Sequence, residues 1–280
     1  MLTTWQKREI WLCGAVLALF ALAVFGPALM QPAHPHNFAD RRAWGHLPSA
    51  MDVLSNLPFA LWGAAGLASL AKLLPAGGTR TAGRQDLAQR VWAAIFFGGL
   101  LVTAFASAWY HHQSNDAGLV VDRLGMVVAF AGLMGLAAAG RVSARAGWWL
   151  GAAVLLLGPV TVAVWATSGN IGPWAVLQFG GMALVLVLGL ARSQPLATSW
   201  DVRWGWVIAV YSLAKLLELT DHEIYALTAE VVSGHTLKHL VASLAAWPVL
   251  AAFHNQGRIE RLQRLLRAQK INKTGVMHAC

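Results

Sequence analysis

The sequence predicts an all-α integral membrane protein, with a core of seven transmembrane helices and one extra N-terminal transmembrane helix. Of its 280 residues, 57% are hydrophobic and only 12% are charged, whereas about 25% of residues are charged in a typical soluble domain. Tryptophans cluster near the ends of apolar runs, as they do at membrane–water interfaces. Examples are Trp44, Trp148, Trp149, Trp204 and Trp206.

Eight apolar segments approach the roughly 20 residues that a membrane-spanning helix needs. The first follows Lys7-Arg8, as in a signal peptide, but it exceeds the about 7–15 apolar residues of such peptides and no clear cleavage site ends it. We therefore expect a retained helix rather than a cleaved one. The expected spans are 10–30, 51–74, 91–111, 118–140, 147–167, 173–191, 204–221 and 234–253.

Lysine and arginine residues alternate between loops in a way that predicts orientation in the membrane. They are frequent at the N-terminus, in the second, fourth and sixth loops and in the tail, and rare elsewhere apart from Arg41-Arg42. This alternation predicts a multi-pass protein with both termini in the cytoplasm. The net charge of +9 does not indicate a nucleic-acid partner, because the basic residues lie in short loops and a tail rather than in a recognition stripe.

The tail from Gly257 to Lys270 alternates isoleucine or leucine with arginine. This pattern predicts a basic amphipathic helix on anionic lipid headgroups, with a solvated helical extension as the alternative. Cys13 and Cys280 indicate neither a disulfide framework nor a cysteine-based metal site.

Ionisable side chains inside apolar segments are costly and therefore point to function. His235 and His239 are four residues apart, so they share one helical face and can bind one zinc ion. A hydrogen-bonded pair of histidines or haem ligation would produce the same spacing. By the charge alternation, both histidines open the last span near the external face.

Ser107 and His111 also share a helical face, and a short loop returns Asp122 beside them. His111 then completes a set of three histidines with a fourth zinc position open to water, as in catalytic zinc sites. Zinc lowers the pKa of such a water to about 7 and makes hydroxide available. A carboxylate such as Asp122 can accept its proton, and a hydroxyl such as that of Ser107 can donate to an oxyanion. His112 is the alternative third ligand, but His111 has the shared face with Ser107.

The patterns Ser107-x3-His111-x10-Asp122 and Gly234-His235-x3-His239 together resemble the alkaline ceramidase family. This family belongs to a superfamily of seven-helix membrane hydrolases that includes adiponectin-receptor-type proteins and GPI-remodelling lipases. Ser55-Asn56-Leu-Pro-Phe is similar to the family's Ser-Asn motif. The resemblance covers about 38–255, and it implies a zinc ion bound by His111, His235 and His239, with Asp122 contacting the zinc-bound water and Ser107 nearby.

The resemblance implies a hydrolase of sphingolipids, which cleaves a ceramide-like amide in the membrane into a fatty acid and an amino-lipid. It indicates a bacterial branch, in the inner membrane, whose substrate can be another lipid amide or an ester because many bacteria lack ceramide. Ser49 stands where eukaryotic family members have a glutamate of a calcium site, so a calcium site is not carried over; Asn37, Asp40 and Asp52 do not map onto its ligands.

The chain thus divides into an N-terminal helix with an outer loop (1–37), a ceramidase-like core (38–255) and a basic tail (256–280). Within the core, Ser55 and Asn56 can support the site or pack helices together. Lys238 is expected on a different face from its neighbouring histidines, reaching towards headgroups. Other polar residues can line a cavity, pair with one another, cap a helix or face solvent; these are His34, His36, His46, Asp116, Lys215, Glu218, Asp221 and His222.

Three functions fit these residues, and a zinc-dependent lipid amidase accounts for most of them. A receptor-like or regulatory lipid-binding protein with structural zinc would not need the acid–base group of Asp122. A b-type haem electron carrier would leave both Ser107 and Asp122 without a role.

Overall fold

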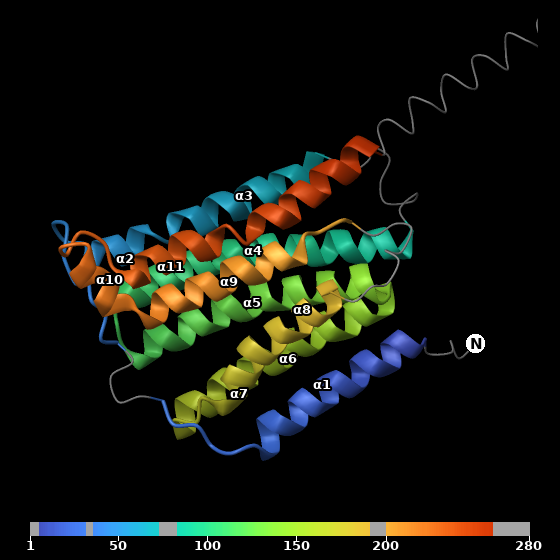
Figure 1. Ribbon diagram of the computed structural model, residues 1–280, viewed down its shortest axis with the longest axis horizontal. Coiled ribbons are helices and arrows are strands. Elements are labelled where there is room, and N and C mark those ends of the chain that lie inside the picture. The colour runs from blue at the N-terminus through green and yellow to red at the C-terminus, as the bar shows by residue number, and fades with distance from the viewer. Residues whose placement is uncertain (1–5, 32–35, 73–82, 191–199, 260–280) are drawn as a thin grey trace, which may run out of the picture.

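The structure is a computed structural model of the chain, and it describes residues 6–31, 36–72, 83–190 and 200–259. Regular secondary structure in these ranges is helical, apart from two isolated bridges, Met30–Asn170 and Trp44–Leu47. Most helices run along the length of one bundle (Figure 1).

Seven helical stretches are long and apolar enough to cross a membrane, as a multi-pass membrane protein requires. Four are single helices and the others contain an interruption. They are α1 (Lys7–Phe25), α2 with α3 (Ala50–Leu54 and Leu57–Lys72), α4 (Arg84–His112), α5 (Asp116–Arg141), α6 (Ala144–Ser168), the stretch Gly172–Leu190, and α11 (Gly234–Ser243) with its continuation to Ile259.

The expected span 204–221 is shorter in the structure. It forms α9 (Trp204–Leu219), whose 16 residues extend about 24 Å at 1.5 Å per residue, less than the roughly 30 Å of a bilayer core. Chain direction changes at Thr220, where the short helix α10 (Asp221–Leu227) begins. The expected span 204–221 is therefore not among the stretches of spanning length, although α9 packs beside α11 in the bundle.

Two of the spanning stretches are interrupted where they border the interior of the bundle. The stretch Gly172–Leu190 consists of α7 (Gly172–Ala175), the π-helical turn η2 (Val176–Gly180) and α8 (Gly181–Leu190). Between α2 and α3, the helix is broken at Ser55 and Asn56. Single π-helical turns are frequent at functional sites, and both interruptions here carry polar side chains that are buried.

Glycines allow α4 and α5 to approach to backbone contact. A Cβ atom on Gly99 would lie 2.4 Å from the backbone nitrogen of Ala129, and one on Gly132 would lie 2.2 Å from that of Phe96. Small residues at such positions are how membrane helices pack closely. This contact fixes the end of α4 relative to the start of α5.

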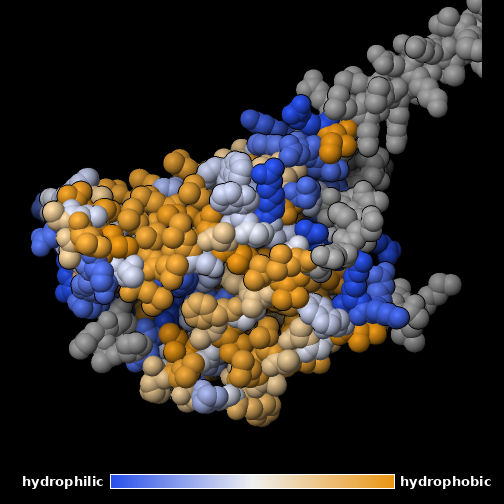
Figure 2. All heavy atoms as spheres, viewed as in Figure 1, coloured by the Kyte–Doolittle hydropathy of each residue, from blue (hydrophilic) through white to orange (hydrophobic). Residues whose placement is uncertain are grey.

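The N-terminal helix α1 lies at the edge of the bundle, against α7 and η2 (Figure 1). Its Glu9 is 2% exposed and accepts hydrogen bonds from the Ser143 hydroxyl at 2.5 Å and from Arg145. Most of the apolar residues on α1 remain exposed, including Leu17 and Phe25. A lipid environment explains such a surface, and Figure 2 shows hydrophobic side chains covering much of one face of the molecule.

Many of the described basic residues lie at one end of the bundle because of where their helices begin and end. Arg84 and Arg90 open α4, Arg141 closes α5, Arg145 opens α6, and Arg203 precedes α9. The opposite end of the bundle receives the end of α4 and the starts of α5 and α11. The charge alternation in the sequence therefore corresponds to two ends of one bundle. Which end faces the cytoplasm stays a prediction. The tail from residue 260 lies outside the described residues.

Candidate metal centre

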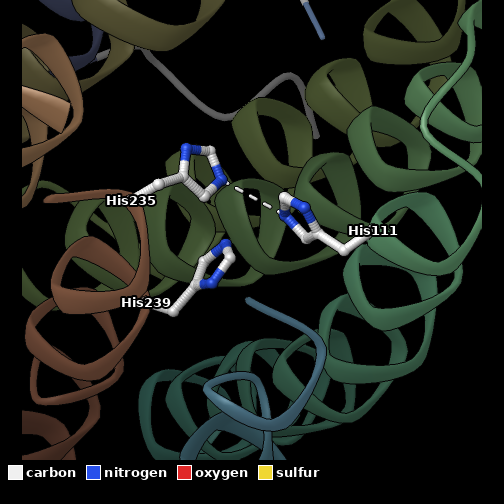
Figure 3. A group of neighbouring side chains, drawn as sticks. All are labelled: His111, His235 and His239. Atoms are coloured by element: carbon white, nitrogen blue, oxygen red, sulfur yellow. Dashed lines mark hydrogen bonds between the residues drawn. The ribbon is translucent and has the colours of Figure 1, made fainter. Parts of the chain in front are cut away.

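Three histidines from two helices converge inside the bundle (Figure 3). His111 lies in the last turn of α4, while His235 and His239 lie on successive turns at the start of α11. Each is at most 5% exposed, and one ligand atom from each lies within 4.8 Å of the others. Within the described ranges, these residues form the one group of three or more histidine, cysteine or acidic residues with this geometry. The group can hold a metal ion.

One pair of ring nitrogens has nearly the spacing of zinc ligands. The Nε2 atoms of His111 and His235 are 3.2 Å apart, and Zn–N bonds of about 2.0–2.1 Å at tetrahedral angles place ligand nitrogens about 3.3 Å apart. The three ring centroids are 4.8–5.0 Å from one another. Such close rings leave no space for a porphyrin between any two of them, so the geometry does not fit haem ligation.

The orientation of His239 is fixed by a serine at the break between α2 and α3. The Nδ1 atom of His239 is 2.8 Å from the Ser55 hydroxyl, and that hydroxyl donates to the carbonyl oxygen of Asp52. The hydroxyl proton is thus used, and His239 donates from Nδ1, which leaves Nε2 as a free lone pair. Metal-binding histidines are commonly held this way by their second nitrogen.

An acid stands behind His111 in the same manner. Asp52 is fully buried, accepts a 2.7 Å hydrogen bond from the Thr236 hydroxyl, and has its other oxygen, Oδ2, 3.9 Å from His111 Nδ1. Neither Oδ2 nor Nδ1 has a hydrogen-bond partner among the described residues. A carboxylate facing the second nitrogen of a histidine is the usual support of a metal ligand. We did not expect this role for Asp52, although an acid inside an apolar segment is a signal for one.

The start of α11 is anchored so that both of its histidines face inwards. The Ser233 hydroxyl caps the helix by accepting from the backbone N–H of Thr236 at 3.0 Å. Asp221 accepts from the backbone N–H of His235 at 2.7 Å and from that of Ala39 at 2.9 Å. Asp221 therefore joins α10, α11 and the loop before α2, a structural role.

One cavity of about 390 Å³ borders two of the three histidines, His235 and His239. Ser107, Asp122, His235 and His239 all line it. Ser107 lies one turn before His111 on α4, and it lines the cavity together with Asp122 on α5. Further along the bundle the lining is apolar, with Phe59, Phe96, Leu133, Phe130 and Met182 among its residues. Four of the polar residues singled out from the sequence thus share one apolar cavity.

Lys238 does not reach towards headgroups as expected. It lines the cavity beside its neighbouring histidines, and its ammonium bonds Glu218 at 2.6 Å. Lys215 bonds the other oxygen of Glu218 at 2.5 Å and lines the cavity too. The pairing and the lining roles considered for Lys215 and Glu218 are therefore both present, because α9 and α11 pack side by side.

Several other polar residues lie away from the centre. His112 is exposed and points away from the histidine group, as its position one residue past His111 requires. His36 does not simply face solvent. Its ring nitrogens contact the Tyr110 hydroxyl at 2.8 Å and Asp116 at 3.1 Å. Asp116 opens α5, while the capping side chain belongs to Asn115. His46 is exposed, as expected, and His34 lies outside the described residues.

In the first outer loop, the carboxylate of Asp40 is paired with an arginine. Arg42 bonds both oxygens of Asp40, at 2.9 and 2.6 Å. Burial would raise the pKa of Asp40, but the hydrogen bonds from Arg42 outweigh it and hold this pKa below its ordinary value. A guanidinium thus balances the charge of this buried carboxylate. Asn56 donates to the Asp52 carbonyl oxygen at 2.8 Å, and its own Oδ1 atom has no hydrogen-bond partner among the described residues.

Comparison with known proteins does not assign the chain to a group. No protein-family model matches the sequence, and no curated protein matches it. The site is therefore interpreted from its own residues and their geometry.

Proposed function

We propose that this protein is a zinc-dependent hydrolase of a lipid amide, similar to the alkaline ceramidases. The observation that carries the proposal is the buried group of His111, His235 and His239 beside Ser107 and Asp122, in a cavity whose remaining lining is mostly apolar. A structural metal site would need neither a carboxylate nor a hydroxyl facing an apolar cavity.

The three histidines would hold the zinc ion through ring nitrogens, with Ser55 and Asp52 on the far side of two of the rings. Zinc bound there supplies a Lewis acid and lowers the pKa of a water to about 7. Three neutral imidazoles and one open position are the donor set of catalytic zinc. The buried, preorientated rings thus fit this ion in number, type and spacing.

The side chains around the cavity have separate tasks in amide cleavage. Asp122 takes a proton from the attacking water and delivers it to the leaving amine. Ser107 donates its hydroxyl proton in a hydrogen bond to the oxygen of the attacked carbonyl. The apolar lining accommodates the acyl chain and keeps bulk water away from the reaction.

The surroundings of the proposed reaction are a membrane and its lipids. We place the protein in a bacterial inner membrane with both termini in the cytoplasm and the centre near the external face. Its substrate is a membrane lipid, amide or ester, and the basic tail binds anionic headgroups. The alternation of basic residues between the two ends of the bundle supports this orientation.

Lipid analysis of cells with the wild-type chain and with Asp122→Asn tests the proposal. We expect fatty acid and a free amino-lipid to accumulate with the wild type, and a loss of about 10²–10⁴-fold in this activity in the variant, as for removal of a general acid–base group. Asp116→Asn is the matched control, because it removes an exposed acid six residues earlier on the same helix. Full activity of Asp122→Asn would contradict the role. Stoichiometric zinc without any lipid product would instead favour a lipid-binding receptor or regulator.

A further inference from the structure

We propose that the lipid cleaved at this site carries a negative charge in its amine portion, close to the scissile amide. Naming the ligand a substrate rests on the proposed hydrolase function, whereas the preference for an anion is a binding property of the cavity. The preference is assigned to Arg123, together with Lys215 and Lys238.

Arg123 is a buried cation in the cavity lining, and one of its donor atoms has no hydrogen-bond partner among the described residues. It follows Asp122 on α5, is 5% exposed and lines the cavity. Its Nη2 atom donates to Gln31 at 2.8 Å, and its guanidinium carbon lies 4.0 Å from the ring centroid of Trp165. Its Nη1 atom has no hydrogen-bond partner among the described residues. A buried cation with an incomplete set of partners is costly, and an anion in the cavity would balance its charge.

The cavity also has one positive charge in excess. Its lining contains three cationic side chains (Arg123, Lys215 and Lys238) and two acidic ones (Asp122 and Glu218), a difference of one. Both oxygens of Glu218 are already bonded by the two lysines. Charges interact strongly in such a partly dry environment, so the excess favours an anion over a neutral polar group.

The positions of the cations place the anion on the amine side of the amide. Arg123 is adjacent to Asp122 and Lys238 is adjacent to His239, so they surround the same end of the cavity as the reacting groups. The apolar lining continues the other way; Phe96, for example, lies 15 residues before His111 on α4, about 22 Å along the helix. An acyl chain that follows the apolar lining leaves the amine portion beside the cations.

Equilibrium binding of two sulfonamides that cannot be hydrolysed as amides tests the proposal. The probes are tritiated N-(dodecylsulfonyl)glycine, which is anionic, and N-(dodecylsulfonyl)ethanolamine, which is neutral, on the full-length protein in detergent. A charge-assisted hydrogen bond is worth about 1.5–3 kcal/mol, so we expect about 10–100-fold tighter binding of the glycine compound. Equal affinities for the two compounds would overturn the proposal.

Arg123→Gln and Lys238→Gln should each reduce the ratio of the two affinities by about tenfold. Because both compounds are measured on one sample, the ratio does not depend on the fraction of protein that has folded. Arg203→Gln is the matched control: it removes an exposed cation just before α9 and should leave the ratio unchanged. An unchanged ratio in both cavity variants would contradict the assignment.

Two further measurements distinguish a lipid site from a site for free anions, and the anion preference from the hydrolase function. Inorganic phosphate at millimolar concentration should not displace the glycine compound; displacement would show a site for free anions and overturn the proposal. Hydrolysis is measured separately with N-lauroylglycine and N-lauroylethanolamine. If both compounds are cleaved at equal rates and bind equally well, the preference for an anionic lipid is wrong and the hydrolase function stands. If the anionic compound binds more tightly but neither compound is cleaved, the preference stands and the hydrolase function is wrong.

Discussion

At the scale of single residues, the centre depends on the groups at the second nitrogen of two of its histidines. Ser55 holds Nδ1 of His239 and Asp52 faces Nδ1 of His111. Both come from the interrupted helix α2–α3, while the histidines come from α4 and α11. One short segment therefore orients ligands from two other helices.

Ser55→Ala should weaken zinc binding about 10–100-fold, the usual effect of removing a group that orients a metal ligand. The matched control is Ser243→Ala, since Ser243 is also buried but donates to the Leu240 carbonyl within its own helix. Competition with a chromogenic chelator measures both affinities. Equal affinities in the two variants would show that the Ser55 contact does not orient His239.

Sequence spacing could identify the three histidines, Ser107 and Asp122, because residues four apart share a helical face and a short loop returns the next helix alongside. It could not identify Asp52 or the tertiary partners of Arg123 and Lys238. Their roles depend on which helices become neighbours. The prediction that Lys238 reaches towards headgroups, which used spacing within one helix, was wrong. The neighbouring helix α9 places Glu218 beside Lys238 instead.

At the scale of helices, the close contact of α4 and α5 positions His111 relative to Asp122. Gly99 faces the backbone of α5 at this contact, whereas its neighbour Gly98 has open space where a Cβ would be. The two glycines are therefore a matched pair on one helix.

Gly99→Ala should destabilise the protein by about 1–3 kcal/mol through overpacking and should lower zinc occupancy by moving α4 away from α5. Gly98→Ala should change stability by less than about 1 kcal/mol, because it adds a methyl group only to open space. Reversible unfolding in detergent with metal analysis measures both effects. Equal destabilisation by the two substitutions would contradict the role given to the contact.

The apolar segments predicted most helices, since a run of about 20 apolar residues is a strong signal. Hydropathy could not predict the interruptions at Ser55 and at η2, which depend on packing and on hydrogen bonds from other helices. It also made α9 a full span, although the helix ends at Leu219.

At the scale of the whole molecule, the two ends of the bundle differ in chemistry. One end carries arginines at the starts and ends of α4, α5 and α6, and the other carries the histidine group and the cavity cations. By the positive-inside rule, we predict that the arginine-rich end faces the cytoplasm.

A fluorescent protein fused after Cys280 should therefore fluoresce, and alkaline phosphatase fused at the same place should be inactive, because the first folds in the cytoplasm and the second only outside it. Fusions in the loop after His112 should show the opposite pair of results. Active phosphatase at the C-terminus would contradict the orientation.

The most direct test of the zinc centre is the metal content of the purified protein by mass spectrometry. We predict about one zinc per chain in the wild type and in His112→Ala, and less than about a tenth of that in His111→Ala and His235→Ala, since loss of one of three ligands removes the closed geometry. Activity towards the lipid amide should fall with the zinc. Full zinc content in His111→Ala, or its loss in His112→Ala alone, would contradict the account.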